Sequence, residues 1–160
     1  MVHARVILVL ALWSVHAVGA TPLSGRVIGV HDGDTLTLLT SDKQPHRVRV
    51  GDIDAPELGQ PFGTASKHSL SLLCFHKHPV VQVQGLDRWG RVIGRVDCAE
   101  ADVATVQVQA GMAWVYRKYS QRPGLLAQEA HAQDASVGLW AQPAVAPWVW
   151  RQQRRREDER

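Results

Sequence analysis

Apolar and polar residues alternate in five short segments of the chain, at residues 25–30, 35–39, 46–50, 80–85 and 91–98. A period of two is typical of strands that bury one face. The turn HDGD (31–34), whose Asp-Gly pair favours the positive φ of a tight reversal, and the turn SDKQP (41–45) separate the first three. The pattern predicts a three-stranded antiparallel meander, followed by a hairpin joined through LDRWG (86–90).

Three other segments have the spacing or the end signals of helices. Residues 64–74 place their leucines near helical spacing, and residues 101–114 are predicted to hold a short helix that Asp102 caps and Gly111 stops. In residues 123–140, Pro123 marks a start and Gly138 an end, after which the chain is expected to fold back onto the core. The predicted fold is α+β, mainly β: a five-stranded Greek-key barrel of the OB type with three helices.

The two ends of the chain differ from the rest. Residues 1–20 combine a basic residue, an apolar run and small residues before a possible cleavage point after Ala20, which predicts a signal peptide and a secreted or periplasmic protein. A single membrane anchor is the alternative. Residues 21–150 are expected to form one domain, and 151–160 a charged, disordered tail. Removing that tail is expected to leave turnover largely intact.

The overall charge says little about a partner. The chain of 160 residues has a net charge of +3, but the excess lies at the ends, and basic and acidic residues balance within 21–150. Any affinity for phosphate must therefore come from local placement.

The only cysteines are Cys74 and Cys98. In an oxidising compartment such a pair suggests a disulfide. A zinc site that borrows His76 and His78 is an alternative, although the Cys-x-His-x-His spacing suits no structural site well. Two free buried thiols are the third possibility.

Charged residues concentrate in three segments at predicted strand ends: HDGDT (31–35), RVRVGDIDAPE (47–57) and DRWGR (87–91). Asp52, Asp54 and Glu57 repel one another unless a metal cation or arginines intervene. Ca²⁺ takes carboxylate and carbonyl oxygens, which Asp54, the carbonyl group of Ala55 and an acid from the DGD turn could supply. Nearby arginines would bind phosphate through paired hydrogen bonds.

One geometric condition must hold for this site. Arg49 and Asp54 are five residues apart and face opposite sides of an unbroken strand. They can converge only if the chain turns between them, and Gly51 is the residue at which we expect that turn.

Taken together, these motifs resemble the staphylococcal (thermonuclease-like) nuclease family. VIGVHDGDTLTL, RVRVGDIDAPELGQPFG, LDRWGRVIGRV, QVQAGMAWVYRKY and GLW stand in that family's order, over residues 24–141. The resemblance implies a five-stranded OB barrel with three helices. It also implies Ca²⁺-dependent hydrolysis of DNA and RNA, which leaves 3′-phosphate ends.

The resemblance also assigns roles to individual residues. It implies that Asp34, Asp54 and the main-chain oxygen of Ala55 ligate calcium, that Glu57 is the general base or holds the attacking water, and that Arg49 and Arg91 bind phosphate. Trp114 and Tyr116 fall where the family places aromatic residues beside the nucleotide. Trp89 stands where tyrosine is more usual, and the loop after Glu57 is short.

Two other classes of protein remain to be weighed. A non-catalytic OB module that binds nucleic acid would be expected to lose some of these acids or arginines, and all of them are present. A sugar-binding barrel has no use for this arrangement of charge. We therefore expect a monomeric nuclease with DNA and RNA as substrates and no stable membrane association after loss of the signal peptide.

Overall fold

The computed structural model describes residues 21–120 and 122–160, so the predicted signal peptide lies outside the described residues. The strands are β1 (Leu23–Ser24), β2 (Arg26–Val30), β3 (Thr35–Leu39), β4 (Pro45–Val50), β5 (Ile53–Asp54), β6 (Val80–Leu86), β7 (Val92–Cys98), β8 (Ala101–Asp102) and β9 (Trp114–Val115). The helices are α1 (Gly63–Cys74), α2 (Val103–Gln109), α3 (Pro123–Asp134), the 3₁₀ turn η1 (Gly138–Ala141) and α4 (Pro147–Asp158).

The five longer strands are those that the alternating pattern predicts. β2, β3 and β4 form an antiparallel meander, and β6 and β7 form an antiparallel hairpin whose β7 pairs in parallel with β4. The sheet order is β1-β6-β7-β4-β3-β2. Its two edge strands are consecutive in the chain and separated only by Gly25, so the sheet must curve back on itself. Among the described strands no ladder closes it, and the predicted barrel is therefore not confirmed.

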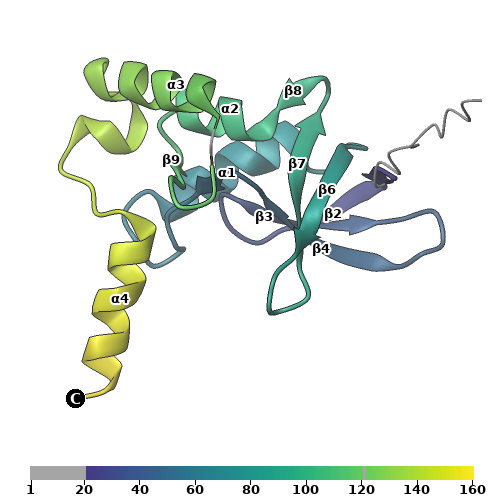
Figure 1. Cartoon of the computed structure of the whole chain (residues 1–160), viewed down its shortest axis with the longest axis horizontal. Coiled ribbons are helices and arrows are strands. Elements are labelled where there is room, and N and C mark those ends of the chain that lie inside the picture. Colours follow the sequence, from purple (N-terminus) through teal and green to yellow (C-terminus); the bar gives the residue numbers. More distant parts are fainter. Residues whose placement is uncertain (1–20, 121) are drawn as a thin grey trace, which may run out of the picture.

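Within the described part of the chain, four α-helices rather than the predicted three accompany the sheet, and Figure 1 shows how they are arranged around it. α2 begins after Asp102, but that side chain makes no capping bond to the helix backbone; it accepts hydrogen bonds from Thr105 and Arg122 instead. α3 ends at Asp134 rather than at Gly138, because Ser136 already adopts a positive φ of 53°. Gly138 starts the 3₁₀ turn that buries Leu139.

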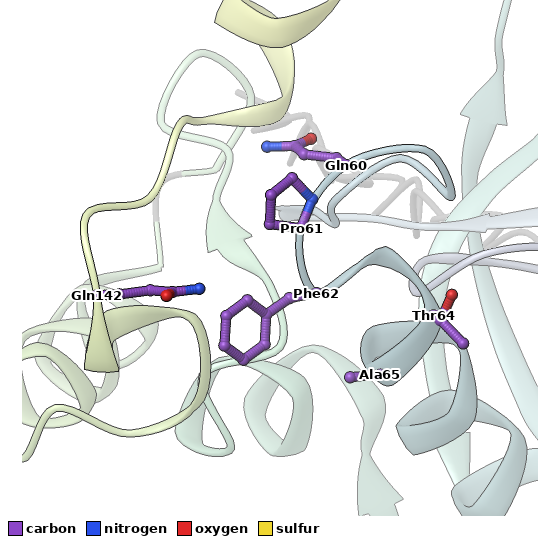
Figure 2. Close-up of a pocket in the computed structure, with 6 residues that line it drawn as sticks. All are labelled: Gln60, Pro61, Phe62, Thr64, Ala65 and Gln142. Carbon is purple, nitrogen blue, oxygen red and sulfur yellow. The ribbon is translucent and has the colours of Figure 1, made fainter.

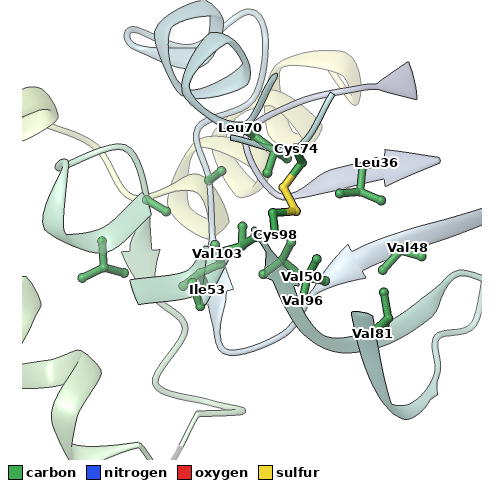
Figure 3. Packing of buried hydrophobic residues seen from close by; sticks show 14 of the residues in the cluster. Leu36, Val48, Val50, Ile53, Leu70, Cys74, Val81, Val96, Cys98 and Val103 are labelled. Carbon is green, nitrogen blue, oxygen red and sulfur yellow. A yellow bond between two sulfur atoms is a disulfide. The ribbon is translucent and has the colours of Figure 1, made fainter. Parts of the chain in front are cut away.

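The apolar core lies between the sheet and the first helices (Figure 3). A disulfide joins Cys74, at the end of α1, to Cys98, at the end of β7, and it is completely buried. This is the first of the three alternatives that the sequence left open for the cysteines. The disulfide fixes α1 against the sheet, and the loop that carries the acids after β4 leads directly into α1.

α4 is the element that the sequence patterns did not predict. Residues 151–160, expected to be a disordered charged tail, lie almost wholly within this helix. Pro147 supplies a favourable first residue, and side chains of the next turn are anchored on the domain while the rest of the charge run faces solvent. In Figure 1 α4 extends from the body on the same side as the turn between β6 and β7. Among the described residues, no helix is both long and apolar enough to span a membrane.

Candidate active site

The charged segments of the sequence meet in one cleft of about 1230 Å³. Its walls come from the turn before β3, from β4 and the residues after it, from the β6–β7 hairpin, and from α4. Five of the predicted site residues with charged side chains line it: Asp34, Arg49, Asp54, Glu57 and Arg91. The loops of three separate segments are thus brought together by the curvature of the sheet.

The turn that carries Asp34 depends on close packing rather than on a left-handed glycine. Gly33 does not have the positive φ expected of it. A Cβ at Gly33 would lie 1.7 Å from Oγ of Ser66 and 2.8 Å from Cβ of Ala55, so only glycine fits there. Nε2 of the buried Gln107 donates to the Gly33 carbonyl oxygen at 2.7 Å and holds the turn from beneath.

Asp34 is tied to the segment after β4. Its Oδ2 accepts a hydrogen bond from the backbone N–H of Ala55 at 3.0 Å, and its Oδ1 accepts one from the Thr35 hydroxyl group at 2.9 Å. The main chain of Ala55 is therefore placed directly beside the carboxylate of Asp34, as a shared calcium site would require.

A turn at Gly51 and Asp52 brings Arg49 and Asp54 to the same side of the chain. Asp52, rather than Gly51, adopts the left-handed conformation, with a φ of 69°. Nη2 of Arg49 then lies 3.0 Å from Oδ1 of Asp54 and 3.4 Å from Oδ2 of Asp34. The condition stated from the sequence is met, and one guanidinium group bridges the two carboxylates among the predicted calcium ligands.

Burial and mutual repulsion shape the electrostatics of this acidic group. Burial raises the pKa of Asp54 even though Arg151 and Arg49 oppose the shift. Burial and the charge of Asp34 raise the pKa of Asp32 to about 7. Burial alone would lower the pKa of Arg49, but Asp34 and Asp54 raise it above its ordinary value. The carboxylates thus lie where added positive charge is strongly favoured.

Glu57 lies at the open side of the cleft, with 41% of its side chain exposed. Its Oε1 accepts a hydrogen bond from Nη1 of Arg151, on α4, at 2.7 Å. The same guanidinium group binds Asp54, with Nη2 2.7 Å from Oδ2 and Nη1 3.2 Å from Oδ1. Arg151 therefore holds both a predicted metal ligand and the predicted base.

Arg91 enters the cleft from the start of β7. Asp87 accepts hydrogen bonds from Nε of Arg91 at 2.7 Å and from the backbone N–H groups of Trp89 and Arg91. This leaves the two terminal nitrogens of Arg91 without an ion pair among the described residues. The Trp89 ring, 66% exposed, lies beneath the guanidinium groups of Arg88 and Arg91.

The two predicted nucleotide-binding aromatic residues have different positions. Tyr116 lines the cleft, 5.7 Å from the guanidinium carbon of Arg49. Trp114 does not line it: its side chain is buried edge-on against Trp140, with ring centroids 5.2 Å apart. The turn that starts at Gly138 carries Trp140 into that contact, so Trp114 packs against this turn and lies outside the cleft.

The residues that sequence reasoning missed are those that support the site from other elements. Gln107 and Glu129 are buried polar side chains on helices whose patterns predict only packing. Trp148, Arg151 and Arg155 recur at intervals of three and four residues, the signal of one helical face. That signal was present in the sequence, but the surrounding run of charge concealed it.

A second hollow, of about 340 Å³, lies beside the start of α1 (Figure 2). The hollow is lined by residues without an ionisable side chain, namely Gln60, Pro61, Phe62, Thr64, Ala65 and Gln142. It offers no group for acid–base or phosphate chemistry. Its importance is structural, because Nε2 of Gln60 donates to the carbonyl oxygen of Val145 and connects this loop to the segment before α4.

The side chains of the cleft provide only some of the oxygen ligands that a hard cation such as Ca²⁺ needs. Asp34 and Asp54 offer buried carboxylate oxygens around a common point, the kind of ligand that Ca²⁺ prefers. Within residues 21–120 and 122–160, no group of three or more His, Cys, Asp or Glu side chains is arranged to hold a metal. A calcium ion here would therefore need main-chain oxygen and water as further ligands, and the oxygen chemistry of the site is compatible with that.

Comparison with known proteins identifies the class. A sequence model of the family described as "Staphylococcal nuclease homologue" matches residues 47–142. "Protein ParB" of Escherichia coli is 41% identical over 150 residues, which cover 86% of this chain and 84% of that protein. An "Uncharacterized endonuclease" of Haemophilus influenzae is 40% identical over 129 residues, which cover 80% of this chain and 72% of that endonuclease. "Micrococcal nuclease" of Shigella flexneri is 37% identical over 139 residues, 79% of each chain.

The protein is therefore a nuclease, a hydrolase. It belongs to the staphylococcal nuclease family. The matched segment contains all of the predicted site residues except Asp34 and ends before α4, so Arg151 lies outside it.

Proposed function

We propose that this chain is an exported, Ca²⁺-dependent nuclease that hydrolyses phosphodiester bonds of both DNA and RNA and leaves 3′-phosphate ends. The observation that supports this most strongly is the convergence of the two predicted arginines and the three predicted carboxylates in one cleft. A binding module needs cationic groups for phosphate, but it has no need for a carboxylate held at the mouth of the same cleft.

Each residue then has a distinct task. Arg49 and Arg91 would bind the phosphate and oppose the charge that grows in the transition state. Glu57 would accept a proton from water as the water oxygen bonds to phosphorus. The bond from phosphorus to O5′ breaks, O5′ takes up a proton, and the products are a 3′-phosphate and a 5′-hydroxyl group.

Asp34, Asp54 and the carbonyl oxygen of Ala55 would hold the calcium ion. When bound, the ion would neutralise the buried carboxylates and polarise a phosphate oxygen. Tyr116 would contact the nucleotide beside Arg49. We further propose that the domain works as a monomeric OB-type barrel and that residues 1–20 are removed on export, which mass spectrometry of the exported protein would test.

The decisive test is cleavage of single- and double-stranded DNA and RNA by the purified protein, with Ca²⁺ or with a chelator. We expect cleavage only with Ca²⁺. Glu57→Gln and Arg91→Ala should each reduce turnover by about 10²–10⁴-fold, the range for loss of a general base or of a charge-stabilising donor. Glu100→Gln and Arg26→Ala, exposed positions outside the cleft, are the matched controls and should retain full activity.

The products also matter in this test. A 5′-phosphate end, or cleavage unaffected by the chelator, would contradict the proposed chemistry. Binding of nucleic acid without cleavage under every condition would favour the non-catalytic module instead.

A further inference from the structure

The starting observation is that a side chain of this protein already binds the acids of the active site. The guanidinium group of Arg151 donates to both carboxylate oxygens of Asp54 and to Oε1 of Glu57. Asp54 is only 2% exposed, so this is a largely desolvated contact. Charge-assisted, bidentate contacts of this kind are among the stronger hydrogen bonds in proteins.

The helix that carries Arg151 is held at the cleft by further contacts. Trp148, one turn before Arg151, stacks on Tyr116 with parallel rings whose centroids are 5.7 Å apart. Pro147 is buried, and the backbone just before it accepts the hydrogen bond from Gln60. Arg155, one turn after Arg151, also lines the cleft. One face of α4 therefore covers the site, and the remaining residues of the helix are mostly exposed.

The contact of Arg151 with Asp54 and Glu57 is incompatible with the calcium-bound form that the proposed function requires. A calcium ion on Asp54 needs carboxylate oxygens that Arg151 now occupies, and Glu57 cannot hold a water through the oxygen that binds Arg151. Two cations compete for one carboxylate. Because arginine stays charged at all physiological pH values, deprotonation of Arg151 cannot open the contact, whereas a cation that binds the carboxylates can.

We propose that α4 is an autoinhibitory latch: Arg151 closes the active site by binding Asp54 and Glu57, and calcium opens it by displacing Arg151 and releasing α4 from Tyr116. The inference rests on the proposed calcium-dependent function. Arg151 is 32% exposed, and among the described residues α4 contributes no side chain to the apolar core cluster, so its release would leave that core intact. The latch makes the apparent affinity for calcium weaker than the intrinsic affinity, by the fraction of molecules that are open.

The first test is a calorimetric titration of the purified protein with CaCl₂ in the absence of nucleic acid. Removing the latch by Arg151→Gln should tighten the apparent Kd for calcium about tenfold, the effect expected if about nine-tenths of molecules are latched. Arg154→Gln is the matched control. It removes the same charge from the same helix, but Arg154 is 62% exposed, has Glu157 as its only ion-pair partner among the described residues, and does not line the cleft. Its Kd should equal that of the unaltered protein.

The second readout follows the helix itself. Calcium should change the tryptophan emission of the unaltered protein as Trp148 leaves Tyr116, and Trp148→Phe should abolish most of that change. Trp150→Phe, on the same helix, should retain the change. Arg151→Gln should show the open-state emission before calcium is added.

The outcomes separate the two proposals. If calcium binds equally well to the unaltered protein and to Arg151→Gln, the latch is wrong and the calcium-dependent function stands. If Arg154→Gln tightens binding as much as Arg151→Gln, the effect is one of general charge and the latch is again wrong. If calcium binds to none of the variants, both proposals fail.

Discussion

At the scale of single residues, two tight turns decide where the carboxylates lie. Gly33 allows the turn before β3 to approach α1 and the segment after β4, and Asp52 accepts the left-handed backbone that reverses the direction of Asp54. Aspartate is one of the few residues other than glycine that tolerate this conformation. Neither role is catalytic, yet both determine the spacing of the predicted calcium ligands.

The role of Gly33 leads to a prediction about stability. Gly33→Ala places a methyl group 1.7 Å from Oγ of Ser66, so the turn must move away from α1. Overpacking of this kind should lower the free energy of unfolding by about 1–3 kcal/mol, measured in urea. Ser66→Gly in the same chain should restore only part of the loss, because Cβ of Ala55 remains 2.8 Å from the added methyl group.

Gly85→Ala is the matched control for this experiment, since a Cβ there would meet no atom within 4 Å. It should unfold at nearly the same urea concentration as the unaltered protein. Equal midpoints for Gly33→Ala and Gly85→Ala would show that the close approach at Gly33 is not required.

Sequence alone could predict only the part of the candidate site that follows from the chemistry of its charged residues. The main charged residues of the site were predictable because neighbouring carboxylates repel one another unless a positive charge lies between them. The arginines were predictable because guanidinium groups bind phosphate. The contact of Arg151 with Asp54 spans 97 residues, and no local pattern reports a pairing at that separation. The position of Trp114 outside the cleft was not predictable for a related reason: its partner Trp140 lies on a distant turn.

At the scale of elements, the sequence patterns predicted those strands and helices that depend on interactions between residues close together in the chain. Alternation identified the five longer strands, since one face of each is more buried than the other along most of its length. The two-residue strands β1, β5, β8 and β9 are too short to show any period. α4 escaped notice because its helical face is only a few side chains wide, and its stability in place comes from tertiary contacts rather than from its sequence.

The disulfide gives a prediction at this scale, because it joins the end of α1 to the end of β7. The cysteines are 24 residues apart, and closing a loop of that size should stabilise the fold by about 3 kcal/mol in the chain-entropy model. The double variant Cys74→Ala and Cys98→Ala should therefore unfold at a lower temperature, as measured by calorimetry.

Two further measurements make the test specific to the disulfide. Alkylation of the unreduced, unfolded protein should leave its mass unchanged, because no free thiol exists. A reductant should lower the melting temperature of the unaltered protein and have no effect on the double variant. Modification of two thiols in the unreduced protein would refute the link.

At the scale of the whole molecule, ion pairs join parts of the chain that lie far apart in the sequence. The guanidinium group of Arg122 contacts Asp52, in the turn after β4, and Asp102, at the start of α2. This connects the turn that aims Asp54 to the helical layer. The active site is thereby coupled to the stability of the whole domain, as well as to its own loops.

This link predicts how stability depends on pH. Burial alone would raise the pKa of Asp102, but the hydrogen bonds from Arg122 and Thr105 outweigh it and lower the pKa below its ordinary value. A carboxyl group whose pKa is depressed by folding stabilises the folded state fully above its unfolded pKa of about 4, and this contribution is lost as the pH falls through the folded value. Asp102→Asn should lower the free energy of unfolding at pH 7 by about 1.5–3 kcal/mol, the range for a hydrogen bond to a charged group.

Because asparagine does not titrate, the difference between Asp102→Asn and the unaltered protein should shrink as the pH falls below about 4. Urea unfolding between pH 3 and pH 7 measures that difference directly. In a chain that already carries Arg122→Gln, the same substitution should cost much less, since the hydrogen bond is absent. A difference that stays constant across the pH range, or that survives the loss of Arg122, would mean that Asp102 acts on stability through some other contact than its pair with Arg122.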